Sequence, residues 1–239
     1  MGKWTVIRGL VPRSWCKNSY NRYRPISAIP VFYVFAMNEL SNGPTSRVEQ
    51  PTIKTLRLII RPFDLSDSDE VQRICSDKEI AANTRTVPYP YPEGAAESWI
   101  AQHPEFWATG RSAVFAVALP EENNVIGAVG LEMNEEDHRA ELGYWIDEKY
   151  RGQGYATEAA IAIVEFGFSY LGLHRIFAHH LARNPVSGKV MVNVGMRQEG
   201  ELRGHVRKWG VFEDIVVFGI LKTDPRKKPL VRIETAGES

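Results

Sequence analysis

Cysteine is scarce in this chain, and long apolar runs are missing. The two cysteines, Cys16 and Cys75, lie far apart and form no CxxC pair, which argues against a disulfide framework and against a zinc site. Such cysteine usage fits a reducing compartment, so we expect a cytoplasmic protein. No apolar run approaches the roughly 18 residues that a membrane-spanning helix needs, so no membrane partner is expected.

An excess of charge of either sign is also missing. The 239 residues contain 29 basic and 29 acidic side chains, which cancel. A balanced chain creates no overall field that would draw it to nucleic acid or anionic lipid, so neither is an expected partner. The hydrophobic fraction of 44% and the charged fraction of 24% are those of an ordinary globular protein with one main domain.

The N-terminal segment has a composition of its own. Residues 1–38 hold six basic residues and no acidic one, because the first acid is Glu39. This composition resembles a mitochondrial transit peptide, which makes the mitochondrion the alternative location. A linker, or a start codon placed too early, explains it equally well, because Met37 opens a polar stretch typical of a disordered terminus. The expected organisation is a flexible extension over 1–53, a folded domain over 54–223 and a polar tail over 224–239.

Period-two alternation and turn residues predict the strands of this domain. Leu56, Leu58 and Ile60 alternate with arginines up to Pro62, which predicts the first strand. The next three strands are separated by short polar turns and therefore predict a meander. The expected strands cover residues 55–62, 112–119, 124–133, 139–147, 174–181 and 211–221.

Helical spacing and end signals predict the helices between these strands. Three prolines within residues 86–94 forbid regular structure there and predict a loop. Gly172 is a plausible stop for the longest helix. The expected helices cover residues 64–77, a segment through Trp99, Ile100 and Phe106, residues 155–172, and a short segment from Pro185.

A glycine-rich run, YRGQGYATEAA at residues 150–160, lies between the fourth expected strand and the longest helix. A helix start presents unpaired N–H groups and a partial positive charge. Glycines such as Gly152 and Gly154 let the backbone come close to an anion without an intervening side chain. The run therefore predicts a phosphate-binding loop, against the alternative that its glycines only turn the chain.

Two common nucleotide-binding motifs do not fit this loop. A Walker P-loop needs GK[ST], but Tyr155 and Ala156 follow Gly154, so no lysine can reach a terminal phosphate. A Rossmann loop needs its third glycine where this chain has Thr157, and it follows the first strand of a βαβ unit rather than a meander.

The run from Arg151 to Ala156 resembles the Q/R-x-x-G-x-G/A signature of the GNAT superfamily of acyl-CoA N-acetyltransferases. The similarity covers about residues 54–223 and looks like the RimJ/RimL branch. The stretches that carry it are PYPYPEGAAESWI, ELGYWIDEKYRGQGYATEA, NPVSGKV with the later Gly195, and FEDIVVFGIL. The chain departs from the family at Met196, where phenylalanine is usual, and at Gly188 within a helix, where glycine costs about 1 kcal/mol relative to alanine.

This resemblance implies an α+β fold with a mixed, mostly antiparallel central sheet. About six or seven strands and about four flanking helices are expected, with a splay between the fourth and fifth strands. It also implies acetyl-CoA as acyl donor, with its pyrophosphate on the glycine loop, its pantetheine on the preceding strand and an asparagine beside the arm. The residues at those positions are Tyr144, Trp145, Ile146, Arg151, Gly152, Gln153, Gly154, Tyr155, Ala156, Thr157 and Asn184.

Ser187 and Glu141 are the catalytic candidates. The resemblance places the hydroxyl of Ser187 near the leaving sulfur, although an ordinary residue in the first turn of a helix capped by Asn184 fits too. Glu141 either lines the acceptor cleft or pairs with a neighbouring arginine such as Arg139.

Three histidines near the fifth expected strand look like a metal-ligand cluster at first. A strand places His179 and His180 on opposite faces, however, so no metal site is expected.

The expected reaction is direct attack of a neutral amine on acetyl-CoA, without a covalent intermediate. The resemblance leaves several acceptors open: a protein N-terminal amine, an amino acid, a polyamine or an antibiotic-like amine. A module that binds acyl-CoA without catalysis is the alternative function, and a monomer or homodimer is expected. The loop TRTVPYPYPEG and Trp99 predict an aromatic acceptor wall, although a packed core explains Trp99 as well.

Overall fold

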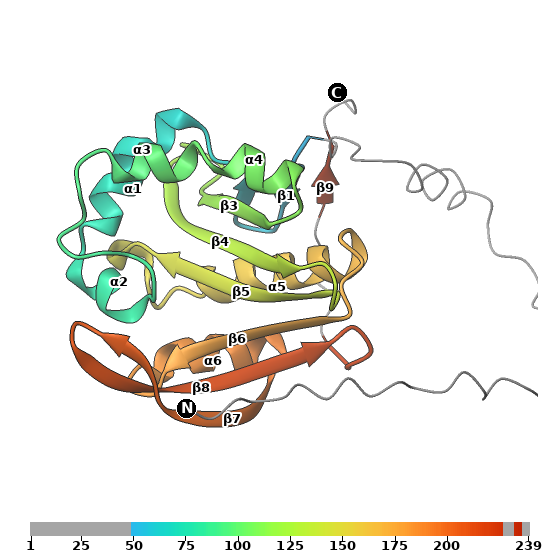
Figure 1. The fold of residues 1–239 in the computed structure, drawn as a ribbon. Helices are drawn as coiled ribbons and strands as arrows, with labels where there is room; N and C mark the ends of the chain where they lie inside the picture. Colours follow the sequence, from blue (N-terminus) through green and yellow to red (C-terminus); the bar gives the residue numbers. More distant parts are fainter. Residues whose placement is uncertain (1–48, 227–231, 236–239) are drawn as a thin grey trace, which may run out of the picture. The chain divides into compact units, whose positions relative to one another are not determined.

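The computed structural model describes residues 49–226 and 232–235, which belong to one compact unit. Their strands form one sheet in the order β7-β8-β6-β5-β4-β3-β2-β1-β9 (Figure 1). β5 and β6 run parallel, and the other neighbouring strands pair antiparallel, so the expected mixed sheet is confirmed. The strands are β1 (Thr52–Lys54), β2 (Ile59–Arg61), β3 (Ser112–Ala118), β4 (Val125–Asn134), β5 (Arg139–Ile146), β6 (Arg175–Leu181), β7 (Arg197–Lys208), β8 (Val211–Leu221) and β9 (Arg232–Glu234).

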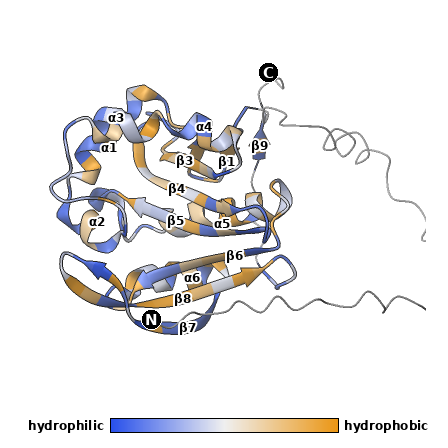
Figure 2. Ribbon diagram, in the orientation of Figure 1, coloured by the Kyte–Doolittle hydropathy of each residue, from blue (hydrophilic) through white to orange (hydrophobic). Residues whose placement is uncertain are grey.

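The described sheet has nine strands, more than the six or seven expected. β1 and β9 have three residues each, too few for a period-two pattern to be read from sequence. β7 is long but mostly exposed, so its sequence RQEGELRGHVRK shows no apolar face. Figure 2 shows this hydrophilic strand beside the more hydrophobic β8, whose backbone holds it in the sheet.

The expected strand over residues 55–62 is wrong in its first half. Thr55 to Leu58 form a turn, closed by a 3.0 Å hydrogen bond from the Thr55 amide to the Leu58 carbonyl. Leu56 is therefore 91% exposed, although Leu58 and Ile60 are buried as the alternation predicts. The sheet extends beyond the expected range of 54–223, because β9 pairs with β1. The predictions of a transit peptide, linker or misplaced start fall on residues 1–48, outside the described part.

Six α-helices occur in the described residues, more than the four or so expected. The region between β2 and β3 contains four short α-helices, preceded by a 3₁₀ turn at Leu65–Asp67, rather than the two helices expected. Asp77 accounts for one division, because its carboxylate accepts from the Glu79 amide and caps a new helix. The helices are α1 (Ser68–Cys75), α2 (Lys78–Asn83), α3 (Ala95–Ile100), α4 (His103–Ala108), α5 (Tyr155–Ser169) and α6 (Pro185–Val194).

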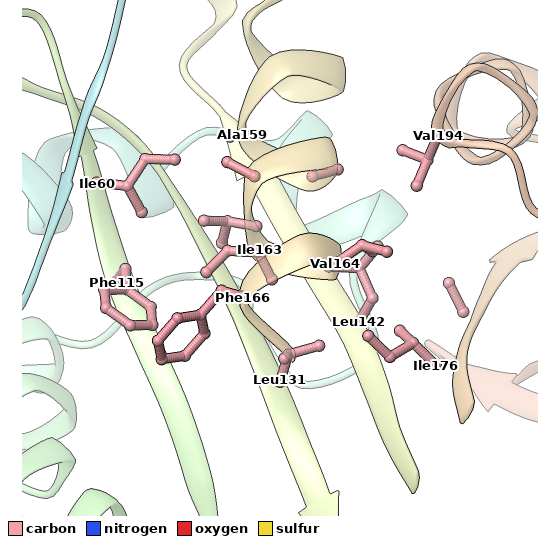
Figure 3. Close-up of a cluster of buried hydrophobic side chains, with 14 of the residues drawn as sticks. Ile60, Phe115, Leu131, Leu142, Ala159, Ile163, Val164, Phe166, Ile176 and Val194 are labelled. Atoms are coloured by element: carbon pink, nitrogen blue, oxygen red, sulfur yellow. The ribbon is translucent and has the colours of Figure 1, made fainter. Parts of the chain in front are cut away.

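The main hydrophobic core lies between the sheet and α5. Ile163 and Phe166 of α5 pack with Phe115 and Leu131 of the strands, and all four side chains are fully buried (Figure 3). α5 and α6 lie behind the central strands in Figure 1. This core fixes the start of α5, which carries the glycine loop, against the end of β5.

A second, smaller core lies on the opposite face of the sheet. Val71, Cys75, Ala96 and Ile100 of α1 and α3 form it, and Trp145 of β5 packs against it. Successive residues of β5 therefore point to opposite sides: Leu142 joins the α5 core, whereas Trp145 faces α1 and α3.

In the part of the chain that the structure describes, none of the helices has the length and apolar character needed to cross a membrane.

Candidate functional site

The site forms where two parallel strands separate. β5 and β6 pair only at their first residues, from Arg139 opposite Arg175 to Glu141 opposite Phe177. Beyond that point no described strand pairs with this side of Leu142–Ile146, while the other side stays paired with β4. The expected splay between the fourth and fifth predicted strands is confirmed, and it leaves backbone groups of Tyr144 to Ile146 without a strand partner, although the Ile146 carbonyl accepts from Arg151.

The glycine loop follows directly, between β5 and α5. Gly152 and Gly154 have φ of +77° and +86°, in the left-handed region that glycine adopts without strain. Gly154 is the N-cap of α5 and offers no side chain to the helix start. The amides of Tyr155, Ala156 and Thr157 thus belong to the helix turn that has no intrahelical acceptor.

This geometry fits a phosphate group. A side chain at Gly152 would meet no atom within 4 Å, so the space beside the loop is open. The first helical turn contributes N–H groups and the positive end of the helix dipole to that space. The residues of the loop can therefore hold the pyrophosphate of a nucleotide cofactor.

The side chain of Arg151 is bound by other groups of the protein. Its Nε donates to the Ile146 carbonyl at 3.0 Å, and its guanidinium pairs with Asp77 at 2.9 Å. The side chain thus ties the glycine loop to the end of β5 and to the N-cap of α2. That Arg151 contributes to cofactor binding, through its backbone, stays a prediction.

Arg57, which the sequence did not single out, lies against the same loop. Its guanidinium pairs with Glu158 of α5 at 2.7 Å, donates to the Gln153 carbonyl at 3.1 Å and stacks 4.6 Å from the centre of the Tyr155 ring. The hydroxyl of Thr55 also donates to Glu158, at 2.7 Å. The turn that replaces the first half of the expected strand therefore supports the helix start.

Ser187 is in contact with β5 across the opening. Its hydroxyl lies 2.9 Å from the hydroxyl of Tyr144, which also donates to the Ser187 carbonyl at 3.0 Å. Burial raises the pKa of Tyr144 to about 12, although the hydrogen bond with Ser187 opposes the shift. The sequence assigned only the backbone of Tyr144 to the site, so its hydroxyl is an addition.

Asn184 is the N-cap of α6, but its side chain makes no cap hydrogen bond. The carboxamide of Asn184 therefore does not cap α6 by a side-chain hydrogen bond, as one interpretation of the sequence expected. Gly188, a departure from the family pattern, has a packing reason: a Cβ there would lie 2.6 Å from Nε2 of buried His180. Glycine lets α6 approach β6 closely beside Ser187.

Glu141 lies on the opposite face of β5 from Tyr144. It does not pair with Arg139, which instead meets Asp137 at 3.0 Å. Its Oε1 lies 2.9 Å from Nδ1 of His179 on β6. This hydrogen bond holds the pKa of Glu141 below its usual value against the opposing effect of burial, and the charges of His179 and Arg85 act in the same direction.

Glu141, Tyr144 and Ser187 line one cavity of about 610 Å³, whereas Asn184 and the glycine loop lie outside its lining. The expected loop contributes Thr84 to Pro88 and Tyr91 to its wall, and Trp99 lines it as well. That this wall faces the acceptor stays a prediction. Glu141 and Ser187 both reach the cavity, from opposite faces of the sheet. The splay thus joins two compartments, one toward α5 and α6 and one toward α1 to α4.

The β7–β8 hairpin holds the wall loop in place. Nζ of Lys208 donates to the Thr84 carbonyl at 2.7 Å. Arg183, which follows β6, donates to the Ala82 carbonyl at 2.6 Å and pairs with Glu213 of β8 at 3.0 Å. Cations on backbone oxygens therefore hold the first residue of the loop and the end of α2, which leads into it.

Within the described residues, no group of three or more His, Cys, Asp or Glu side chains is arranged to hold a metal ion. His179 and His180 point to opposite faces, as their strand positions predict: one reaches Glu141 and the other packs against α6.

Comparison with known proteins agrees with this geometry. The family described as the acetyltransferase (GNAT) domain matches residues 57–197. The chain is 30% identical over 174 residues to the uncharacterized N-acetyltransferase p20 of Bacillus licheniformis, covering 72% of this chain and 97% of that protein. It is 26% identical over 188 residues to the ribosomal protein uS5-alanine N-acetyltransferase of Escherichia coli, covering 76% and 96%.

A solved structure shows the same fold. Mycobacterium smegmatis RimJ in complex with CoA-disulfide matches with a TM-score of 0.67 and 22% identity, covering 74% of this chain and 91% of that one. The chain therefore belongs to the GNAT acetyltransferase family, in its RimJ/RimL-like branch, and is an N-acetyltransferase. The α+β fold expected from the sequence is confirmed.

Proposed function

We propose that this enzyme transfers the acetyl group of acetyl-CoA to the N-terminal amine of a polypeptide by direct attack. One observation carries the proposal: an ionised carboxylate, Glu141, and a hydroxyl pair, Tyr144 and Ser187, flank the open edge of β5 from opposite faces. The reaction removes a proton from the amine and gives a proton to the leaving thiolate. It therefore needs a base on the acceptor side and an acid on the donor side.

The donor side of the cavity fits coenzyme A. The open backbone edge at Tyr144 to Ile146 can pair with the amides of a pantetheine arm, as one strand pairs with another. The carboxamide of Asn184 is available beside that arm. The loop from Arg151 to Thr157 can hold the pyrophosphate. Acetyl-CoA supplies the acetyl group and a thiolate leaving group.

Glu141 serves as the proton acceptor for the attacking amine, directly or through water. Its lowered pKa keeps it ionised at neutral pH. An α-amino group with a pKa near 7.7–8.0 needs only about 1–1.4 kcal/mol to lose its proton at pH 7, whereas lysine near 10.4 needs about 4.6 kcal/mol. A single carboxylate that is hydrogen-bonded to His179 suits the less costly of the two reactions, the deprotonation of an α-amino group.

Ser187 serves as the proton donor to the thiolate: as its proton moves to the sulfur, the proton of the Tyr144 hydroxyl, 2.9 Å away, moves to the Ser187 oxygen, and water returns a proton to Tyr144. The Tyr144 hydroxyl donates its proton to the Ser187 carbonyl. In the contact between the two hydroxyl groups, the Ser187 hydroxyl is therefore the donor and the Tyr144 oxygen the acceptor. A rotation about the Ser187 side chain can turn its proton toward the cavity, which Ser187 lines.

The acceptor assignment draws support from the relative whose name specifies an alanine of ribosomal protein uS5. A direct test offers the full chain acetyl-CoA and a peptide that has one internal lysine, with the N-terminus free or chemically blocked. Release of coenzyme A and the mass of the product are measured. We expect acetylation of the free N-terminus and none of the blocked peptide.

Other results would contradict the proposal in distinct ways. Acetylation of the lysine, or a clear preference for polyamines, would overturn the N-terminal acceptor but not the chemistry. Binding of acetyl-CoA without turnover of any amine would favour a non-catalytic module.

A further inference from the structure

The acceptor face of the sheet contains a row that lacks large side chains. Strand register places Val114 of β3, Gly130 of β4 and Gly143 of β5 side by side. Their neighbours Phe115, Leu131 and Leu142 belong to the α5 core, so this row faces the opposite side, toward α3 and α4. Gly143 leaves the β5 end of the row open, because a Cβ there would meet no atom within 4 Å, whereas Val114 closes the floor at Gly130, where its Cγ2 would lie 3.3 Å from a Cβ.

Side chains bound this row on both sides. Ser112, Glu132 and Glu141 form the next row toward the paired ends of β5 and β6 and make a polar wall. Ala116, Ala128 and Trp145 form the row on the other side and make an apolar wall. The row between these walls is therefore the floor of a trough that runs across three strands, with Glu141 at its β5 end.

Aromatic side chains cover the trough. Trp99 of α3 and Phe106 of α4 line the same cavity as Val114, Gly130 and Gly143. His103 packs 4.4 Å from the Trp99 ring, and burial lowers its pKa to about 4, so this part of the roof is neutral at pH 7. Arg111, which also lines the cavity, stacks 4.5 Å from the centre of the Phe106 ring. A roof of the uncharged Trp99 and His103 rings, with this cation beside Phe106, suits an apolar group and disfavours a second cation.

The dimensions match one large side chain. Neighbouring strands lie about 4.8 Å apart, so the floor from β5 to β3 extends about 10 Å. An amine beside Glu141 places the carbon that carries it over Gly143. A leucine, methionine or phenylalanine side chain on that carbon then lies over Gly130 toward Val114.

We propose that this trough, with its floor of Val114, Gly130 and Gly143 and its roof of Trp99 and Phe106, selects acceptors whose amine lies next to a large apolar group. This inference rests on the proposed function and names its substrate class: peptides that begin with a large apolar residue rather than with alanine.

Gly143 provides the sharpest test. A Cβ at Gly143 would meet no atom within 4 Å, so Gly143→Ala is compatible with the fold and adds a methyl group to the trough floor. Gly130 is unsuitable, because its Cβ would lie 3.0 Å from the Ala113 carbonyl oxygen. Gly200→Ala in β7 is the matched control, since a Cβ there also meets nothing within 4 Å and Gly200 is outside the cavity lining.

The experiment measures kcat/KM for peptides that differ only in residue one, and for phenylethylamine against ethylamine. We expect the wild type to favour phenylalanine or leucine over alanine by about tenfold or more, within the range that a few methylenes give in an apolar pocket. Gly143→Ala should bring this ratio toward one and change the acetyl-CoA dissociation constant less than twofold. Gly200→Ala should leave the ratio unchanged.

The outcomes separate this inference from the proposed function. Equal acetylation of all peptides by the wild type, or an unchanged ratio in Gly143→Ala, would overturn the trough and leave the N-terminal acceptor intact. A tenfold loss of acetyl-CoA affinity in Gly143→Ala would assign Gly143 to the donor side and also overturn it. Preference for phenylethylamine over ethylamine, without turnover of any peptide, would support the trough and overturn the peptide acceptor. Failure to acetylate any amine would overturn both.

Discussion

The two sides of β5 are built in opposite ways. The proposed donor side uses one continuous stretch, from Tyr144 through the glycine loop to Thr157, and offers mainly backbone groups. The proposed acceptor side gathers side chains from the loop after α2, from α3 and α4, and from β3 to β6. A continuous backbone site can be recognised in a sequence as a motif, whereas a site gathered from distant segments cannot.

The two sides also differ in what holds them. On the donor side, ion pairs of Arg151 with Asp77 and of Arg57 with Glu158 fix a loop that would otherwise be free to move. On the acceptor side, the shape comes from two glycines and a roof of rings. Changes to the donor side should therefore affect cofactor binding for every acceptor, and changes to the acceptor side should affect the choice of acceptor.

The largest expected effect comes from the donor side. Gly154→Val should abolish acetyl-CoA binding, because a branched side chain would occupy the place of the phosphate and because φ of +86° disfavours valine. Calorimetry with acetyl-CoA at 100 times its dissociation constant should show about 2.7 kcal/mol of added stability in the wild type and none in the variant.

Gly172→Val is the control for backbone strain in this experiment. Gly172 has φ of +71°, and a Cβ there meets nothing within 4 Å, but it lies after the far end of α5. The Gly172→Val variant should lose stability as Gly154→Val does, but acetyl-CoA should still stabilise it. A folded Gly154→Val protein that binds acetyl-CoA normally would remove the glycine loop from the donor site.

Ser187→Ala tests whether the hydroxyl pair acts in the chemical step. We expect kcat to fall about a hundredfold, the lower end of general-acid effects, with acetyl-CoA affinity nearly unchanged. Tyr144 keeps its hydrogen bond to the Ser187 carbonyl in this variant, so the strand should not move.

Tyr144→Phe, alone and combined with Ser187→Ala, tests whether the two hydroxyl groups act together. If they act in series, the effects of the two substitutions are not additive. The double variant should be no slower than the slower single variant. Equal losses of affinity and rate in Ser187→Ala would instead make Ser187 a cofactor contact. Unchanged kinetics would leave it an ordinary residue of α6.

The smallest expected effect is that of Glu141→Gln. It should lower kcat/KM tenfold to a hundredfold, the range of modest general-base catalysis. The Glu141 carboxyl has a pKa below its usual value, so it is ionised throughout pH 6–9 and does not itself titrate there. The loss should therefore shrink toward pH 9, where the acceptor amine is already neutral. Wild-type rates for the variant at every pH from 6 to 9 would exclude Glu141 from the mechanism.

The sequence predicted the sheet meander, the long helix and the glycine loop that precedes it, because each depends on local spacing. It missed β7, which has no apolar face of its own and is held by pairing with β8. It also placed the turn at Thr55 inside a strand, since alternation continues across a turn.

The site shows the same limit. His179 was considered only as a metal ligand, although it meets Glu141 because β6 starts in parallel register with β5. That register is a long-range property which no spacing within one strand reveals. The pairing of Gly130 with Gly143 is hidden for the same reason.

The clamp on the wall loop has an evolutionary consequence. Lys208 donates a hydrogen bond to the Thr84 carbonyl, and Arg183 donates one to the Ala82 carbonyl at the end of α2. Every amino acid carries such a carbonyl oxygen. Mutations in the loop can therefore alter the side chains that face the cavity while the anchor persists. A lineage of such enzymes can diversify its acceptors by drift in this loop, without first having to rebuild the scaffold that holds it.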